Sequence, residues 1–361
     1  MNVGIIGGGV IGTSCAYHLS DRGHEVTLFE RDEIGSGTTA ASMAVFVWQA
    51  VPPTEFAHRL RRRAWEEYAA FIDGGELEYT RTGLRHVAWS ESTLETYREY
   101  ADDLDAAGVD ATVRSGDGPY DDDRAIGELY TPEDGYFDPV SVAELYARKA
   151  RAAGATIRTG TTVTDLDTES GRVTGLELDG DEIAVDAVVN AAGPWAPAVC
   201  VADDDLPLRR TAGPIVGFET DEDVEIPFSL FENDLYVRDY SNGVYVGHYN
   251  TDYRDDEDAN PDTTATPDDG GAFEQRARNL LGHLGFDADD LRRDTAWTGY
   301  RTVTPDGLPI VGEGTTENYY LAVGMSGLGI TRAPVVGQSV ADAVGGESSS
   351  MLREMSPDRF D

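Results

Sequence analysis

The feature that most constrains the fold is a glycine-rich segment near the N-terminus, where Gly7, Gly9 and Gly12 have the spacing G-x-G-x-x-G. An apolar run precedes it, a helical pattern follows it, and a second strand-like run, 25–29, ends at Glu30. This order predicts a βαβ unit that binds a dinucleotide: the glycines permit a tight turn, close approach of backbone N–H groups to a pyrophosphate, and close packing of helix on strand. Glu30 can accept hydrogen bonds from a ribose 2′-hydroxyl and would repel a 2′-phosphate, which favours an unphosphorylated adenine dinucleotide over NADP-like ligands. The alternative, a glycine-rich turn in an ordinary α/β sheet, is disfavoured because strand, helix and acidic residue are all in place.

Length and composition are those of a large globular chain. The 361 residues are 40% hydrophobic, which suffices for a buried core and for two domains. No stretch approaches the roughly 18 apolar residues of a membrane helix, and the chain begins with a predicted strand rather than a basic, apolar leader. We therefore expect no membrane span and a cytoplasmic location.

The charge balance is strongly acidic. Asp and Glu number 67 against 28 Lys and Arg, the net charge is -39, and Lys149 is the only lysine. The acidic residues are spread through the chain, with runs at 102–103, 121–123, 203–205 and 255–258. Such a charge requires screening, and molar salt reduces the Debye length to about 3 Å, so the composition favours a halophilic protein of a salt-rich cytoplasm over an acidic surface for a basic partner.

Two further ligand classes are disfavoured. Nucleic acid needs clustered Lys and Arg, and the one basic run, 59–63, is short and lies in a predicted helix. Cys15 and Cys200 have no neighbour at C-x-x-C or zinc-ligand spacing, and the six histidines are scattered, so we expect no metal.

Hydrophobic periodicity and turn residues divide the rest of the chain into elements. Asp138 can cap a helix whose first residue is Pro139, and Gly154 ends that helix. Residues 241–243 form a hairpin signal between two alternating runs, and 252–271 reads as an acidic loop. The predicted helices are 54–72, 92–108, 139–153, 272–284 and about 333–344. The predicted strands are 83–89, 156–158, 161–166, 173–178, 182–190, 235–238, 244–248, 308–312 and 319–323.

Six segments together resemble the D-amino-acid oxidase-like family of FAD-dependent oxidoreductases, the group of glycine oxidase, sarcosine oxidase and D-amino-acid dehydrogenase. The segments are the glycine loop with Glu30, GSGTTAA at 35–41, GYFDP at 135–139, VNAAGPW at 189–195, TPDGLPIVG at 304–312, and GMSGLG at 324–329 before Ala333 and Pro334. Their order and spacing carry the resemblance, which covers most of the chain.

The interleaving of the elements, together with this resemblance, implies an α/β fold: a Rossmann-like FAD-binding domain with an inserted β-rich (α+β) substrate domain. The FAD-binding domain is then discontinuous, made of 1–82, 140–205 and 296–361. Residues 83–139 and 206–295 form the substrate-binding domain.

The resemblance also assigns residues to a non-covalent FAD. Thr38 and Thr39 would line the pyrophosphate and the flavin face, unless this stretch is only a polar linker. Residues 327–330 would place backbone N–H groups and a helix N-terminus at the flavin pyrimidine edge, where reduced flavin carries negative charge, unless they are a connecting turn. The residues assigned to FAD are Gly7, Gly9, Val10, Ile11, Gly12, Glu30, Arg31, Thr38, Thr39, Ala41, Ser42, Met43, Val163, Ala192, Gly193, Trp195, Gly327, Leu328, Gly329, Ile330 and Thr331.

For the substrate, the resemblance points first to Arg301. It lies in a Gly-Tyr-Arg segment where glycine-oxidase-like members place an arginine that grips the substrate carboxylate, and a bidentate pair gives orientation as well as energy. A structural arginine is the alternative. Tyr236 and Arg238 share one face of their predicted strand and, with Tyr245 and His248, either line the open face of the flavin or are ordinary sheet residues. We take Arg301, Tyr236 and His248 as the candidate catalytic residues.

The chain departs from the family pattern at three places. Sarcosine-oxidase-like members attach flavin through a cysteine, but the corresponding stretch here, 298–300, is Thr-Gly-Tyr, which predicts non-covalent FAD. The only candidate for an oxygen-activating lysine is Lys149, outside the predicted substrate sheet, which shifts weight from oxidase to dehydrogenase. The loop 325–327 lacks the arginine of glycine-oxidase-like members, and Arg332 is either its displaced substitute or a helix-start residue.

The resemblance implies FAD-dependent oxidation of the C–N bond of a small amino acid or N-methyl amino acid. Hydride transfer to flavin N5 would give an imine that water converts to a keto acid or aldehyde acid. The electron acceptor is O2 or another acceptor, and the oligomeric state stays open. Two alternatives remain: a 2-hydroxy-acid or polyol-phosphate dehydrogenase on the same fold, and a non-catalytic flavin-binding electron-transfer or sensor subunit.

Overall fold

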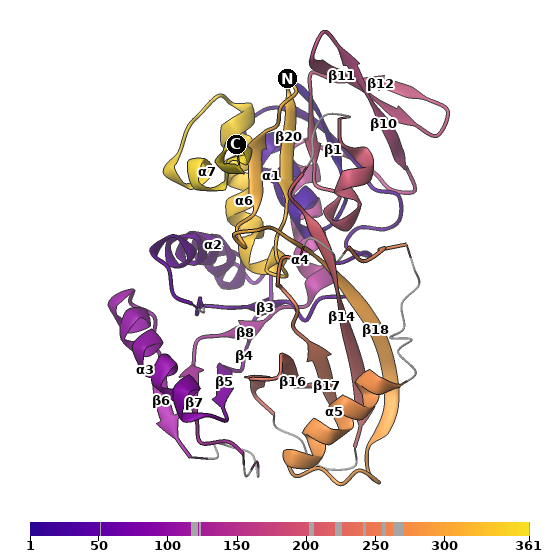
Figure 1. Cartoon of the computed structure of the whole chain (residues 1–361). Helices are drawn as coiled ribbons and strands as arrows, with labels where there is room; N and C mark the ends of the chain where they lie inside the picture. The colour runs from indigo at the N-terminus through magenta and orange to yellow at the C-terminus, as the bar shows by residue number, and fades with distance from the viewer. Residues whose placement is uncertain are drawn as a thin grey trace.

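The structure is a computed structural model of the whole chain, and it describes residues 1–50, 52–116, 122, 124–201, 206–220, 226–240, 243–254, 258–262 and 271–360 (Figure 1). The acidic runs predicted at 121–123, 203–205 and 255–258 fall largely outside this described part. So do residues 241 and 242 of the predicted hairpin turn and residues 255–257 and 263–270 of the predicted acidic loop.

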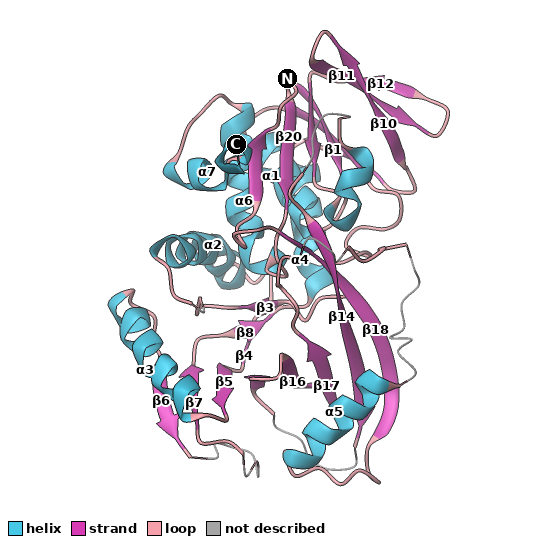
Figure 2. Cartoon of the chain, viewed as in Figure 1, coloured by secondary structure: helices cyan, strands magenta, loops and turns pink. Residues whose placement is uncertain are grey.

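A six-stranded sheet forms the upper half of the molecule as drawn in Figure 2. Its order is β19-β20-β13-β1-β2-β9, and every neighbouring pair is parallel except β19 with β20. The strands are β1 (Asn2–Ile6), β2 (Glu25–Phe29), β9 (Thr156–Arg158), β13 (Ala187–Asn190), β19 (Ile310–Glu313) and β20 (Tyr319–Val323). The chain leaves β1 towards β2 on one side and returns through β13 on the other, so a topological switch point lies beside β1, where α/β proteins bind their ligands.

Apolar layers cover both faces of this sheet. Helices α1 (Val10–Asp21), α4 (Pro139–Ala152) and α6 (Gly329–Val344) bury one face, and α2 (Glu55–Asp73) packs on α6. A three-stranded antiparallel sheet of β10 (Val163–Glu169), β11 (Arg172–Leu178) and β12 (Glu182–Ala184) covers the other face. Burial on both faces explains why the central strands are continuous apolar runs rather than alternating ones.

An eight-stranded, mostly antiparallel sheet forms the lower half (Figure 2). Its order is β18-β14-β17-β16-β15-β5-β7-β6, with β15 and β5 parallel. Helix α5 (Ala272–His283) covers one face, and α3 (Glu91–Ala106) packs against the β5 and β7 end. The strands are β5 (Leu84–Ala88), β6 (Thr112–Ser115), β7 (Gly127–Thr131), β14 (Arg209–Glu219), β15 (Phe228–Phe231), β16 (Leu235–Tyr240), β17 (Gly243–His248) and β18 (Arg292–Val303).

Short elements complete the described part of the chain. Strands β3 (Val45–Phe46), β4 (Thr80–Arg81) and β8 (Gly135–Tyr136) form a small sheet between the two halves (Figure 1). A 3-10 helix η1 (Gly193–Val199) follows β13, and α7 (Ser350–Met355) with η2 (Pro357–Phe360) packs on β19. No helix in the described residues is both long and apolar enough to span a membrane.

The α/β fold class predicted from the sequence is confirmed, and two of the predicted elements need correction beyond small shifts at their ends. The run 182–190, predicted as one strand, is two strands in different sheets: β12 pairs with β11, and β13 pairs with β1. The break falls at Asp186, whose N–H donates to Asn2 O at 2.8 Å and starts the new sheet. The last helix starts at Gly329, four residues before the predicted start, because the loop after β20 enters the helix directly.

Candidate functional site

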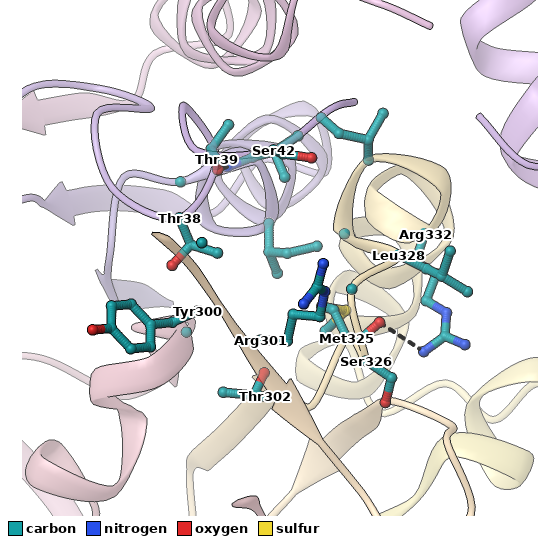
Figure 3. Close-up of a pocket in the computed structure, with 18 of the residues that line it drawn as sticks. Thr38, Thr39, Ser42, Tyr300, Arg301, Thr302, Met325, Ser326, Leu328 and Arg332 are labelled. Carbon is teal, nitrogen blue, oxygen red and sulfur yellow. Dashed lines mark hydrogen bonds between the residues drawn. The ribbon is translucent and has the colours of Figure 1, made fainter. Parts of the chain in front are cut away.

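A cavity of about 1040 Å³ lies at the carboxyl ends of β1, β2 and β13 and extends to the eight-stranded sheet. This volume is at the upper end of the roughly 300–1,000 Å³ found for small-molecule sites. Segments that are far apart in sequence meet around it: the glycine loop, residues 37–45, the loop after β13, β18 and the loop before α6. Figure 3 shows labelled residues of three of them, the segment with Thr38, β18 with Arg301 and the loop with Met325.

Two glycines of the N-terminal loop are fixed by close backbone packing. Gly7 has φ 105°, a left-handed conformation, and a Cβ there would lie 2.6 Å from Ala191 O. A Cβ on Gly12 would lie 1.9 Å from Gly7 O. The turn and the start of α1 can therefore form only with glycine at both positions, as predicted from the sequence.

The N-cap residues of the two helices that begin at the cavity, α1 and α6, provide no side-chain cap, and in α1 only the N–H of Val10 is bound by a side chain from elsewhere, Thr39 Oγ1. Thr54, Ser90, Asp138 and Ser349 cap helices α2, α3, α4 and α7, whereas α5, which begins away from the cavity, also lacks a side-chain cap at Gly271. Uncapped first-turn N–H groups need an acceptor, and a helix N-terminus favours negative charge. The cavity therefore offers two anion-binding ends, and this geometry fits the pyrophosphate and the flavin pyrimidine edge of the expected FAD.

Glu30 lies at the end of β2, beside the glycine loop. Its carboxylate accepts hydrogen bonds from Gly8 N at 2.6 Å and Asp32 N at 2.9 Å. These bonds hold the carboxylate at the lip of the cavity, where a ribose hydroxyl could reach it. The guanidinium of Arg31 stacks on the Trp195 ring at 3.9 Å, and Val163 lines the same end.

The small-residue segment after Ile34 connects the two ends of the cavity. Thr39 Oγ1 accepts a hydrogen bond from Val10 N at 3.1 Å and so ties this segment to the first turn of α1. The indole N–H of Trp297 donates to Ala41 O at 3.1 Å, which ties the segment to β18. Figure 3 shows Thr38, Thr39 and Ser42 on one side of the cavity and Arg301 opposite them.

Arg301, on β18, reaches the inner part of the cavity. Its Nη2 donates to the backbone O of His248 at 3.1 Å, while its buried Nη1 has no hydrogen-bond partner within the described residues. The side chain occupies space left by two glycines: a Cβ on Gly213 would lie 2.1 Å from Arg301 Nη1, and one on Gly327 would lie 3.0 Å from Arg301 Cδ. A positioned guanidinium with a free donor is suited to hold an anionic ligand group.

Tyr236 also faces the cavity, and its neighbours on β16 and β17 do not. Its ring stacks on Phe228 with centroids 5.4 Å apart, and burial raises the pKa of its phenol above the usual range. Arg238 lies 4.0 Å from the ring centroid of Tyr136 and is outside the cavity lining. His248 contributes its carbonyl to Arg301, while its side chain follows the alternation of Val244 and Val246, which pack against α5.

Most of the residues predicted for the site line the cavity. Those that do are Gly7, Gly9, Val10, Ile11, Glu30, Arg31, Thr38, Thr39, Ala41, Ser42, Met43, Val163, Ala192, Gly193, Trp195, Tyr236, Arg301, Gly327, Leu328, Gly329 and Ile330. Gly12, Thr331 and His248 do not line it. Thr331 is instead buried at the start of α6, where its hydroxyl donates to Val45 O at 3.2 Å.

Sequence reasoning missed four side chains that line the cavity: Gln49, Arg61, His86 and Tyr249. The basic run 59–63 was visible, but only its helical register places Arg61 inward while Arg62 and Arg63 are exposed. For Arg332 the sequence leaves two interpretations, a displaced substitute for the family's loop arginine or a helix-start residue; it is buried in the first turn of α6 and lines the cavity.

The remaining candidates lie elsewhere. Lys149, on α4, forms an ion pair with Glu76 at 2.8 Å and does not reach the cavity. Cys15 is buried in α1, where burial raises the pKa of its thiol to about 12, and neither cysteine lines the cavity. Within the described residues, no cluster of three or more His, Cys, Asp or Glu side chains could hold a metal ion.

Comparisons with known proteins agree with this geometry. Residues 2–343 match the sequence model of a family described as FAD dependent oxidoreductase. The chain is 27% identical over 358 residues to a glycine oxidase of Bacillus licheniformis, covering 94% of this chain and 92% of that protein. It is 26% identical to a D-amino acid dehydrogenase of Xanthobacter autotrophicus, covering 96% of each. The crystal structure of L-proline dehydrogenase from P. horikoshii superposes with a TM-score of 0.86 at 23% identity, covering 99% and 97% of the two chains.

Proposed function

The chain belongs to the family of FAD-dependent oxidoreductases, and from that premise we propose that it oxidises the C–N bond of a small amino acid or N-methyl amino acid. The observation that carries this proposal is Arg301, whose Nη1 is buried at the inner end of the cavity without a partner in the described chain. A guanidinium in this position is suited to pair with the α-carboxylate of an amino acid.

When bound, FAD supplies the acceptor for a hydride from the carbon that bears the nitrogen. The protein's own contribution is binding and orientation. Arg301 holds the carboxylate, His248 O positions the guanidinium, and the apolar wall that includes Tyr236, Phe228 and Ile215 excludes water from the reacting carbon. No acid–base pair is required, because a neutral amine can lose hydride directly. The imine product then reacts with water to give a keto acid or aldehyde acid and ammonia or an amine.

For the cofactor, we propose the residues assigned from the sequence, with two roles refined. Gly12 acts through helix packing, and Thr331 through its hydrogen bond to Val45 O. The proposed division into domains stays 1–82, 140–205 and 296–361 for FAD and 83–139 and 206–295 for substrate, although the last boundary falls within β18.

We predict that the FAD is bound non-covalently. Neither cysteine lines the cavity, and Gly299 stands at the cavity wall in the stretch where the sequence predicted no linking cysteine. Precipitation of the purified protein with acid should therefore leave the yellow colour in the supernatant. Colour retained in the washed pellet would contradict this prediction.

Anaerobic bleaching of the flavin by a substrate panel tests the proposed activity. We expect amino acids or N-methyl amino acids to bleach the visible flavin absorbance and 2-hydroxy acids and polyol phosphates to leave it unchanged. Bleaching by a hydroxy acid or polyol phosphate alone would assign the other dehydrogenase class. No bleaching by any compound, with flavin bound, would favour an electron-transfer or sensor role.

We further propose a halophilic protein of the cytoplasm. The support is the net charge of -39 with one lysine. The electron acceptor is O2 or another oxidant. The position of Lys149 on α4, paired with Glu76, favours a dehydrogenase over a lysine-assisted oxidase.

A further inference from the structure

The inner end of the cavity gathers positive charge in a chain that is otherwise strongly negative. Three arginines line it, Arg61 from α2, Arg301 from β18 and Arg332 from α6. None of them has an ion-pair partner within 4.0 Å in the described part of the chain, although most other arginines there do. A buried cation without a counter-ion is costly, so unpaired guanidiniums in a cavity indicate an anionic ligand.

Arg332 is 6% exposed, and its Nη1 donates to Met325 O at 3.1 Å. This is the only hydrogen bond that its guanidinium makes to described residues. Burial, followed by the nearby charge of Arg61, lowers the pKa of Arg332 to about 9, which leaves it charged at neutral pH. In Figure 3, Arg301 and Arg332 lie on either side of Met325, so their guanidiniums do not converge on one point.

Arg61 is 5% exposed and is held in place by the backbone. Its Nε donates to Val47 O at 2.7 Å and its Nη1 to Ala57 O at 3.0 Å. Burial lowers the pKa of Arg61 to about 10, while Asp134 and Tyr249 oppose that shift. Tyr249 therefore lies near both Arg61 and Arg332, and its ring centroid is also 5.7 Å from the guanidinium carbon of Arg301.

Gln49 adds neutral hydrogen-bonding capacity to the lining of the same cavity. It is 1% exposed and lines the cavity, yet neither its amide oxygen nor its amide nitrogen has a partner within the described residues. A buried amide left without partners in the protein indicates a polar ligand group beside it. His86 also lines the cavity, but burial lowers the pKa of its ring to about 4, so it adds no charge at neutral pH.

Nearby carboxylates do not offset the three arginines. Asp306 is bound by Arg359 at 2.8 Å, and Glu232 accepts hydrogen bonds from Trp89 N and Ser90 N. Glu232, Asp234 and Asp306 are all exposed residues at the rim. Asp134 is buried outside the lining; burial raises its pKa to about 7, and its charge supports that of Arg61 but not those of Arg301 and Arg332.

We propose that the substrate is an amino dicarboxylate: an amino acid, or an amine carrying carboxymethyl groups, with a second carboxylate besides the one that Arg301 holds. Arg332 and Arg61 take the second carboxylate, and Gln49 hydrogen-bonds to it or to the amine. This inference rests on the proposed amine oxidation. A dianion must also approach a protein with a strongly negative surface. Molar salt screens that surface charge and so permits the approach.

The test compares matched ligands on the FAD-loaded protein in molar KCl. Aspartate and glutamate of both configurations are compared with asparagine and glutamine, and iminodiacetate with N-methylglycine. The anaerobic rate of flavin bleaching against concentration gives a half-saturation for each. We expect each dicarboxylate to have a half-saturation about tenfold to a hundredfold below that of its neutral partner, as for a charge-assisted pair.

A binding measurement keeps the inference separate from the proposed function. Malonate, succinate and glutarate cannot be oxidised at a C–N bond, but they should perturb the flavin spectrum at lower concentration than acetate and propionate do. If no amine bleaches the flavin but these dicarboxylates bind tightly, the proposed activity fails and the dicarboxylate site stands. If neutral amino acids bleach the flavin at lower half-saturation than dicarboxylates, the proposed activity stands and the dicarboxylate site fails.

Variants of Arg332 and Arg61 assign the second carboxylate to its residues. Arg332→Gln and Arg61→Lys should raise the half-saturation for dicarboxylates about tenfold or more relative to that for neutral amino acids. Arg62→Gln is the matched control, because Arg62 is the exposed neighbour of Arg61. Flavin content and flavin reduction potential are measured for each variant. If the ratio of the dicarboxylate half-saturation to the neutral-ligand half-saturation is unchanged in both variants, the assignment is overturned. If that ratio is unchanged and the flavin reduction potential shifts in Arg332→Gln, Arg332 acts on the flavin instead.

Discussion

Raising KCl from 0.1 M to 2 M should raise the melting temperature of this protein strongly. In dilute buffer, a measurable fraction of the molecules should be unfolded. The net charge of -39 is confined to one folded chain. For a compact sphere of about 27 Å radius, screened Coulomb repulsion falls by on the order of 10 kcal/mol between 0.1 M and 1 M salt, relative to the expanded chain. That change is as large as the whole stability of a typical domain, roughly 5–15 kcal/mol.

Clustered carboxylates show this repulsion locally. Glu177, on β11, has a pKa that is raised by desolvation and by the neighbouring charges of Asp167, Asp165 and Glu182. A carboxyl whose folded pKa is raised favours folding when it is protonated and opposes folding as the pH rises through that pKa. The buried Asp134, with a pKa of about 7, acts in the same direction. At low salt, the melting temperature should therefore rise as the pH falls from 8 towards 6.5. Below that pH the buried His86, whose pKa burial lowers to about 4, opposes the gain, because the unfolded chain then binds the proton more readily.

Differential scanning fluorimetry on flavin fluorescence, confirmed by circular dichroism, measures both effects. Sucrose at matched osmolality is the control, because it strengthens burial without screening charge. If screening is the cause, most of the rise occurs below about 1 M salt, where the Debye length reaches 3 Å. A melting temperature that is flat or falls with KCl would reject salt adaptation and favour an acidic surface made for a basic partner.

The residues proposed for the cofactor could be picked out from sequence because the backbone geometry that they require is mostly local. Gly7, Gly12 and Glu30 lie within one βαβ unit, and the distances that require glycine at two of these positions are between residues a few positions apart or on the adjacent loop. Segments such as 35–41 and 324–329 lie elsewhere in the chain, yet each forms its own turn. Their proposed roles rest on local backbone geometry, which a sequence motif preserves.

The residues proposed to bind the substrate could not all be predicted from the sequence, because they lie far apart in the chain and come together only in the folded structure. Arg61, Tyr249 and Arg332 come from α2, the segment after β17 and α6, and no pattern in the sequence connects them. His248 shows the opposite error. Its strand was identified, but alternation along β17 places the side chain on the α5 side, and the residue reaches Arg301 only through its carbonyl.

Arg301→Ala should weaken substrate binding roughly tenfold to more than a hundredfold, without loss of flavin. Losing a charge-assisted hydrogen bond costs about 1.5–3 kcal/mol, and each 1.4 kcal/mol is tenfold in affinity. Arg301→Lys keeps the charge but loses the planar fork, so it should be impaired nearly as much. The measurement is the anaerobic rate of flavin reduction against substrate concentration, with flavin content as the check on folding.

Gly213→Ala tests the same role without removing the guanidinium. A Cβ at this position would lie 2.1 Å from Arg301 Nη1, so the side chain must move away from the place where Gly213 now admits it. The half-saturation should rise as in Arg301→Lys. Gly282→Ala is the matched control. Gly282 lies on α5, and a Cβ there would have no neighbour within 4 Å. If Arg301→Ala reduces its flavin with wild-type half-saturation and limiting rate, Arg301 is structural and the carboxylate is held by Arg332 or Arg61. If Arg301→Ala instead purifies without flavin, Arg301 serves the cofactor. The proposed amine oxidation then loses the observation that carries it.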